Sequence, residues 1–220
     1  MKNYTLRRSL PLLALALIVI PSWMPQSGLA ETETPIGYPM TSYMRCTREP
    51  AILNALHAMD QTAASRESLR WIVDQPVRVV FKDMKLLSKG LENYDALSWI
   101  SGQGEQVILV NEKHRNAPPE ALAAMLSHEA LHNDPFNSIS EEIAGWRAEA
   151  LVWTEIKKLN PALSQIPTGM LPLVDRENRI EKEYDKGNLE AFVKGNAGYR
   201  NLPESSPGFN PPARTANANR

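Results

Sequence analysis

Residues 124–134 read AMLSHEALHND, a stretch in which two histidines and one glutamate stand among alanine, leucine and methionine. The apolar residues before them predict a buried helix, with its cap at Asn116 or Ala117 and Pro118 in its first turn. Because Pro135 disfavours helical backbone at the preceding residue, we expect the helix to end near there. The two histidines would then project from the same face, one turn apart.

The histidines and the glutamate between them form an HExxH motif, His128-Glu129-Ala-Leu-His132. Imidazoles at this spacing can bind one zinc ion through ring nitrogens at roughly 2.0–2.1 Å. Zinc lowers the pKa of a bound water to about 7, and Glu129 lies where it can accept the proton of that water. No Lys or Arg lies at i±3 or i±4 to pair with Glu129, although burying an unpaired carboxylate is costly. We therefore predict that His128 and His132 bind zinc and that Glu129 is the catalytic base.

A second helix is predicted to begin at Ser138 and to run to about Leu159. Catalytic zinc sites usually have three protein ligands, and this helix offers three glutamates for the third position. Glu141 follows Ser138 by three residues in a capping box, which gives Glu141 a structural role at the helix start. This leaves Glu142 free to bind the metal.

Glu142 lies on one helical face with Trp146, Glu149 and Trp153, a pattern typical of a lined pocket rather than of a solvated surface. Glu142 is the predicted third ligand. Glu149 is the second candidate, and otherwise a hydrogen-bond partner of a ligand histidine; Glu141 is the third candidate. The remaining histidines, His57 and His114, are interpreted as histidines packed in the core.

An HExxH helix followed by a glutamate ligand from the next helix resembles the gluzincin group of zinc metallopeptidases. The segment EEIAGW, residues 141–146, is similar to the E-x-x-A ligand helix of that group, with Gly145 in place of the alanine. No histidine follows His132, unlike in the metzincin pattern. The resemblance covers residues 77–159. It implies a minimal α+β zincin-like domain, in which a small antiparallel sheet packs on the two helices.

The resemblance also implies how a substrate would bind. The strand Gln106–Asn111 would be the sheet edge that lines the cleft, where an extended peptide could pair by strand addition. Such enzymes often have a further proton donor for the oxyanion, commonly a tyrosine or histidine. Tyr94, Tyr184 and Tyr199 are available for this role.

Outside these segments the sequence predicts one or two helices within 50–72, a strand at 77–84 and a hairpin whose strands are 96–101 and 106–111. A polar helical stretch over 173–195 is predicted to break near Gly187. Residues 31–48 are predicted to form an extended lead-in and residues 201–220, rich in Pro, Ser and Asn, a disordered tail. The metallopeptidase domain would therefore occupy residues 49–200.

The first thirty residues have the layout of a secretory signal peptide: a basic start, an apolar run that is too short to span a bilayer, and small residues before a cleavage point after Ala30. We therefore expect an exported protein, periplasmic or secreted, without a membrane span after cleavage. Loss of Lys2, Arg7 and Arg8 would shift the net charge from −1 to −4, which argues against nucleic-acid binding. The sole cysteine, Cys46, cannot form an intrachain disulfide and is predicted to be a buried or unpaired thiol.

The sequence thus predicts a zinc-dependent hydrolase that acts on a peptide or protein. The same site could hydrolyse another amide, such as a peptide crosslink of a cell wall. Two alternatives are an exported scaffold that binds metal without catalysis and an interaction protein in which the motif has no metal.

Overall fold

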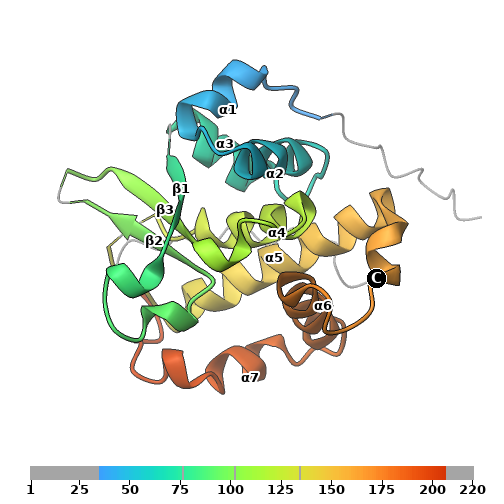
Figure 1. Ribbon diagram of the computed structural model, residues 1–220. Coiled ribbons are helices and arrows are strands. Elements are labelled where there is room, and N and C mark those ends of the chain that lie inside the picture. Colours follow the sequence, from blue (N-terminus) through green and yellow to red (C-terminus); the bar gives the residue numbers. More distant parts are fainter. Residues whose placement is uncertain (1–34, 76, 102, 134, 207–220) are drawn as a thin grey trace, which may run out of the picture. The chain divides into compact units, whose positions relative to one another are not determined.

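The computed structural model describes residues 35–75, 77–101, 103–133 and 135–206. Within these ranges the chain forms seven α-helices and one three-stranded sheet (Figure 1), so the predicted α+β class is confirmed. The predicted signal peptide, residues 1–30, lies outside the described residues. No helix in the described ranges combines the length and the apolar character that crossing a membrane requires.

Helix α4 (Pro119–Glu129) is the most enclosed element of the structure. Its alanine, leucine and methionine residues favour helix, and every residue from Ala121 to Glu129 is buried. A helix that is apolar on all sides needs neighbours on all sides. α4 packs on α5 (Ile139–Leu159), as Figure 1 shows, and on α2 (Pro50–Asp60) and α3 (Arg66–Asp74). Its cap is Pro118, one residue beyond the predicted positions.

The start of α5 is held by a segment distant in sequence. The N–H groups of Ile139 and Ser140 donate to the carbonyl oxygens of Pro203 and Glu204, at 2.9 and 3.0 Å. These bonds satisfy donors that the first turn of a helix leaves without an internal partner. Residues 201–206 belong to the predicted tail; they form neither helix nor strand, but they are fixed to α5. The rest of the predicted tail, residues 207–220, lies outside the described residues.

The sheet contains β1 (Arg78–Lys82), β2 (Ala96–Ile100) and β3 (Gln106–Asn111), in the order β1-β3-β2. β2 and β3 form the predicted antiparallel hairpin, but β1 pairs with β3 in parallel. The sheet is therefore mixed, and the predicted antiparallel sheet is wrong. The connection from β1 to β2, residues 83–95, is long enough to leave a gap one strand wide. The returning β3 fills this gap and must run parallel to β1.

The strand order also corrects the predicted cleft edge. β3 has a neighbour on each side, so the expectation that it forms the edge is wrong, and β2 is the edge strand nearest to α4. Along the sheet, residues such as Ile108 and Val110 face the helices and are buried. Trp99 lies on the opposite face and is 60% exposed. This alternation has the two-residue period of a sheet with one buried face.

The N-terminal part of the described chain departs from the predicted extended lead-in. Residues 40–46 form helix α1 (Met40–Cys46). A helix this short is unstable alone, so its contacts must stabilise it. Tyr43 and Cys46 are buried in the main core, and the Tyr43 hydroxyl lies 3.0 Å from the Asp60 carboxylate at the end of α2. These contacts are tertiary, and the local sequence carries no sign of them.

The last two helices follow the prediction. α6 (Pro172–Asp185) and α7 (Leu189–Lys194) occupy the predicted interrupted stretch. The interruption lies at Gly187, whose φ of 71° is in the region that favours glycine. Both helices pack on α5. They cover a second face of α5, while Ser140, Arg147, Leu151 and Lys158 stay exposed.

Cys46 is free and fully buried, as predicted, and its thiol lies 3.4 Å from the carbonyl oxygen of Ile72. Burial raises the pKa of this thiol to about 11. Only about one thiol in a thousand would be ionised at pH 8, and the thiolate is the reactive form. We expect no reaction with Ellman's reagent over hours in the native protein, and one thiol per chain after unfolding in guanidinium. Complete labelling of the native protein within minutes would contradict the structure here.

Candidate metal centre

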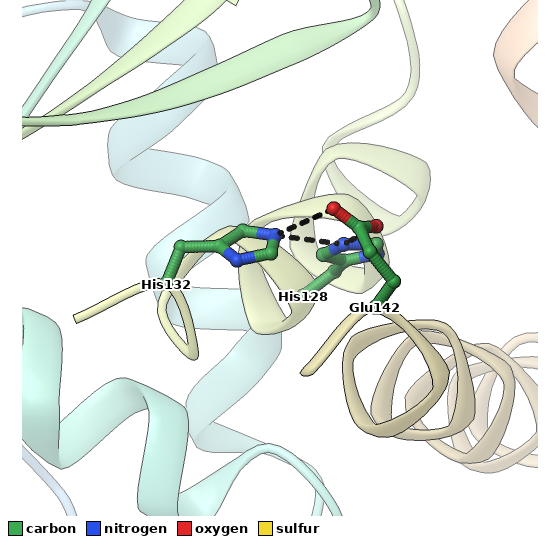
Figure 2. Close-up of side chains that lie close together, drawn as sticks. All are labelled: His128, His132 and Glu142. Atoms are coloured by element: carbon green, nitrogen blue, oxygen red, sulfur yellow. Dashed lines mark hydrogen bonds and ion pairs between the residues drawn. The ribbon is translucent and has the colours of Figure 1, made fainter. Parts of the chain in front are cut away.

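His128, His132 and Glu142 converge where α4 ends and α5 begins (Figure 2). The Nε2 atoms of His128 and His132 are 3.1 Å apart. The Glu142 carboxylate lies 3.4 Å from Nε2 of His128 and 3.7 Å from Nε2 of His132. Two ligands of a tetrahedral zinc ion would lie about 3.3 Å apart, given bonds of about 2.0–2.1 Å. The three side chains are thus spaced as a group that could hold one metal ion.

The far side of each imidazole is tied to a glutamate. Nδ1 of His128 lies 3.1 Å from Oε2 of Glu149, and Nδ1 of His132 lies 3.1 Å from Oε1 of Glu141. A carboxylate can only accept, so each Nδ1 donates its N–H. In the neutral rings this places a lone pair on each Nε2. Two lone pairs that face each other at 3.1 Å repel unless a cation or a proton lies between them.

The surroundings of His128 favour a protonated ring when no metal is bound. Burial alone lowers the pKa of His128, but the carboxylates of Glu142 and Glu149 outweigh it and raise the pKa to about 10. The same position therefore attracts positive charge, and a divalent cation would compete with the proton for it.

Glu142 has one oxygen that is satisfied and one that is not. The side-chain amide of Asn137 donates to Oε1 at 2.6 Å, whereas Oε2 is buried, accepts no hydrogen bond and faces Nε2 of His128 at 3.4 Å. Beside a neutral His128 ring this oxygen has no partner, which costs about 1–3 kcal/mol. Burial by itself raises the pKa of Glu142, but His128, His132 and Asn137 hold it at about 2, so the carboxyl is ionised. The residues present fit a cation, which would give this oxygen its partner.

Glu129 lies beside the cluster and is 9% exposed. Burial raises the pKa of its carboxyl, His128 and His132 oppose this, and Glu142 and Glu149 reinforce it. A raised pKa brings a carboxylate closer to the range in which it can accept a proton and release it again. Figure 2 shows the three potential ligands; Glu129 belongs to the same turn of α4 as His128.

His132 does not lie on the helix, contrary to the prediction. α4 ends at Glu129, and the chain continues through two tighter turns, in which Leu131 N–H donates to His128 and His132 N–H to Glu129. Two carbonyl oxygens of this segment also accept hydrogen bonds from the sheet. Gln106 of β3 donates to the carbonyls of Glu129 and His132, at 3.2 and 2.9 Å, and Ser98 of β2 donates to that of His132 at 3.1 Å. This capture explains the early helix end and fixes His132 to the sheet.

Gly145 lets α5 approach the His128 ring. A Cβ atom at this position would lie 2.6 Å from Cδ2 and 2.8 Å from Nε2 of His128, closer than real Cβ contacts. Trp146 packs its ring against the same imidazole, with the centroids 6.1 Å apart. The glycine that replaces the alanine of the E-x-x-A pattern therefore has a local reason. It also settles the register, because the glutamate three residues before it, Glu142, is the one that faces both histidines.

The other two glutamate candidates each serve a histidine. Glu149 has the alternative role that the sequence offered, as the hydrogen-bond partner of His128. Glu141 was assigned to a capping box, and its N–H does donate to Ser138 at 3.3 Å. Its carboxylate, however, is the partner of His132. Glu141 therefore has two roles: its backbone belongs to the helix cap, as predicted, and its side chain orients His132.

Among the tyrosine candidates, Tyr199 lies closest to the cluster. Its hydroxyl accepts a hydrogen bond from Nε1 of Trp146 at 3.1 Å. Burial and the nearby Glu142 carboxylate raise the pKa of Tyr199, so its hydroxyl keeps its proton. Tyr94 is 42% exposed, and Tyr184 packs beside Trp146 in a second apolar cluster.

The two remaining histidines differ in burial. His114 is buried, as predicted, and its Nε2 lies 2.7 Å from the Asp95 carboxylate. His57 is exposed on α2, so the prediction that it packs in the core is wrong. The helical pattern of α2 buries Ile52, Leu56 and Met59, which leaves position 57 on the opposite face.

The sequence analysis missed three residues of the centre: Gln106, Asn137 and Arg176. Gln106 occupies a strand position that faces the core, where an apolar residue is usual, and this mismatch is the one clue that could have found it. Asn137 lies in a loop, and Arg176 lies on α6, which reaches the centre only in the folded chain.

Comparison with known proteins yields no match: no family model, no curated protein and no solved structure matches this chain. The geometry described above therefore stands on the residues of this chain alone.

Gly145→Ala tests the close approach of α5 to His128. A Gly→Ala change inside a helix normally stabilises by roughly 0.5–1 kcal/mol. Here we expect the opposite sign, a loss of about 1–3 kcal/mol in the free energy of unfolding, because the new methyl group overlaps the imidazole. Urea unfolding of both proteins measures this. A Gly145→Ala protein more stable than the wild type would show that the ring does not lie against this glycine.

Gln106→Leu tests the capture of the α4 end by the sheet. Leucine fits the volume but removes the amide, so the Glu129 carbonyl keeps only the His132 N–H and the His132 carbonyl keeps only the Ser98 hydroxyl, while the Trp71 indole N–H loses its acceptor. We therefore expect a loss of about 1–3 kcal/mol in the free energy of unfolding. Gln103→Leu is the matched control, because Gln103 is exposed in the hairpin turn and its change should have little effect. Equal stabilities of the two variants in urea would argue against the capture.

Proposed function

We propose that this chain is a zinc-dependent hydrolase, and more specifically a metallopeptidase. One observation carries the proposal: two imidazoles, each fixed through Nδ1 by its own carboxylate, turn Nε2 toward one another and toward a third carboxylate. In metal sites, histidine ligands almost always donate their other N–H in this way, which fixes the tautomer that can bind.

The donor set favours zinc over calcium or magnesium. Imidazole nitrogens suit zinc, copper, iron and nickel, whereas calcium and magnesium take oxygen ligands. Two histidines and one glutamate also leave the fourth position of a tetrahedral ion open, as a catalytic site requires.

Charge supports a divalent ion. Buried around the histidines are Glu129, Glu141, Glu142 and Glu149, and Arg176 is the cation that pairs with one of them, Glu149. Burial raises the pKa of Glu129, which favours its neutral form. With both histidines neutral, as metal binding requires, the other three carboxylates exceed the single arginine. Buried charge without compensation is costly, and an ion of charge +2 would offset the excess.

When bound, zinc would lower the pKa of a coordinated water to about 7 and polarise a substrate carbonyl. Glu129 would accept the proton of the attacking water and deliver it to the leaving amine. Glu142 would share the ion with the two histidines, and Glu141 and Glu149 would keep the rings in their binding orientation. Tyr199, a protonated hydroxyl beside Glu142, is the tyrosine best placed to donate to the developing oxyanion.

A peptide substrate fits the neighbouring sheet edge. β2 has β3 on one side, and its Ser98 donates to the backbone of His132 at 3.1 Å. An extended peptide that adds to this edge would run past the turn that carries His132, with its backbone hydrogen bonds providing affinity. This transfers the role that the sequence gave to Gln106–Asn111 onto β2.

A metal-binding protein without catalysis is the second candidate. It is favoured by burial, because the exposed fractions of His128 and Glu142 are 4% and 3%. A closed site resembles a structural metal site more than a catalytic one. Export through residues 1–30 belongs to either proposal.

Glu129→Gln separates the two candidates. We expect one zinc per chain in both wild type and variant, measured by elemental analysis, because Glu129 is not a ligand. Hydrolysis of a library of quenched fluorescent peptides should fall by at least about 10²-fold in the variant, the contribution of a general base. Glu120→Gln, near the start of the same helix and bonded to Asn160, is the control and should keep full activity.

The outcomes divide the proposals. A wild type that binds zinc but cleaves no peptide supports the non-catalytic candidate. A Glu129→Gln protein as active as wild type removes the catalytic mechanism. A folded wild type without affinity for zinc removes both.

A further inference from the structure

Arg176 lies behind the centre, on α6, with its guanidinium among three carboxylates. Both Nη atoms donate to Glu149, one to each carboxylate oxygen. Nε lies 3.1 Å from Asp95, and Nη1 donates to Glu177 at 2.7 Å. The side chain is 15% exposed. Contacts with three carboxylates in a partly buried position restrict the orientation of this guanidinium.

The two-pronged contact with Glu149 matters because of what Glu149 touches next. Its Oε2 accepts the Nδ1–H of His128 at 3.1 Å. The planar fork of an arginine matches both oxygens of a carboxylate and so fixes the plane of the carboxylate as well as its position. The orientation of His128 is therefore set through Glu149 by a residue that does not touch the histidine.

Arg176 also supports His128 by a second route. Its guanidinium lies over the ring of Trp146, 5.4 Å from the centroid. Trp146 in turn packs against His128, with the centroids 6.1 Å apart. Both groups that hold the back of the His128 ring are thus in contact with the same arginine.

We propose that Arg176 is a positioning residue of the metal centre, which holds the Glu149 carboxylate in the orientation that turns Nε2 of His128 toward the ion. The proposal rests on the proposed function, since it concerns the affinity for zinc. It extends the centre beyond α4 and α5 to α6, and through Asp95 to the residues that precede β2.

The test measures the zinc affinity of the purified full chain by competition with a chromophoric chelator. We expect Arg176→Gln to weaken zinc binding by roughly 10–100-fold, the usual effect of losing a partner that orients a ligand. Arg176→Lys keeps the charge but not the fork, and it should recover only part of the affinity. The control is Arg179→Gln on the same helix, since Arg179 is exposed and lies over the Phe192 ring, 5.7 Å from its centroid. It should bind zinc within about twofold of wild type.

A double-mutant cycle separates positioning from general support of the fold. If Arg176 acts through Glu149, then Arg176→Gln should cost much less affinity on a Glu149→Gln background than in the wild type. A merely structural arginine would cost the same on both. Circular dichroism and the urea midpoint establish that each variant is folded.

The results distinguish a failure of the role of Arg176 from a failure of the proposed function. A folded Arg176→Gln protein that binds zinc within about threefold of wild type overturns the inference and leaves the proposed function intact. Additive losses in the cycle overturn it as well. If Arg176→Gln does not fold, the comparison of Arg176→Lys with Arg179→Gln decides, and equal affinities overturn the inference. A wild type that does not bind zinc overturns the proposed function instead.

Discussion

The structure depends on the burial of several carboxylates beside two imidazoles, in the space between α4, α5 and α6. Charge in such a place is stable only where every group has a partner, because the surroundings are apolar and water is excluded. α4 creates this environment, since its residues are buried on all sides. Glu141, Glu142 and Glu149 come from α5 and Glu129 from α4, and the compensating arginine comes from α6. The same three helices therefore enclose the charged groups and supply the partners that compensate them.

The two histidines are held by different parts of the fold. His128 is supported by α5 and α6, through Glu149, Trp146 and the space that Gly145 leaves. His132 lies beyond the helix end and is held by Gln106 and Ser98 of the sheet. The approach of their Nε2 atoms to 3.1 Å therefore requires the sheet and the helices to be assembled correctly. A centre built in this way is formed only in the folded chain, and an ion bound to it would stabilise that state over the unfolded one.

Elements with a local signal were predicted well. Ser138 and the apolar period define the start of α5, the glycine-rich turn defines the β2–β3 hairpin, and Gly187 separates α6 from α7. Elements stabilised by distant contacts were not. The helix at 40–46 depends on Asp60 and the core, and the parallel pairing of β1 depends on where β3 inserts. Both depend on residues far away in the sequence, so a pattern of neighbouring residues does not predict them.

The sequence by itself determined which groups could form the centre: the spacing of His128 and His132 and the helical face of Glu142 name three residues that meet in the structure. The spacing succeeded although α4 ends at Glu129, because the tighter turns that follow keep the two imidazoles on the same side of the chain, with their Nε2 atoms 3.1 Å apart. Only the tertiary structure decided which carboxylate orients which imidazole, that Gln106 ends α4, and that Arg176 stands behind Glu149. These contacts join residues that no period relates, and they exist only once the separate elements have packed.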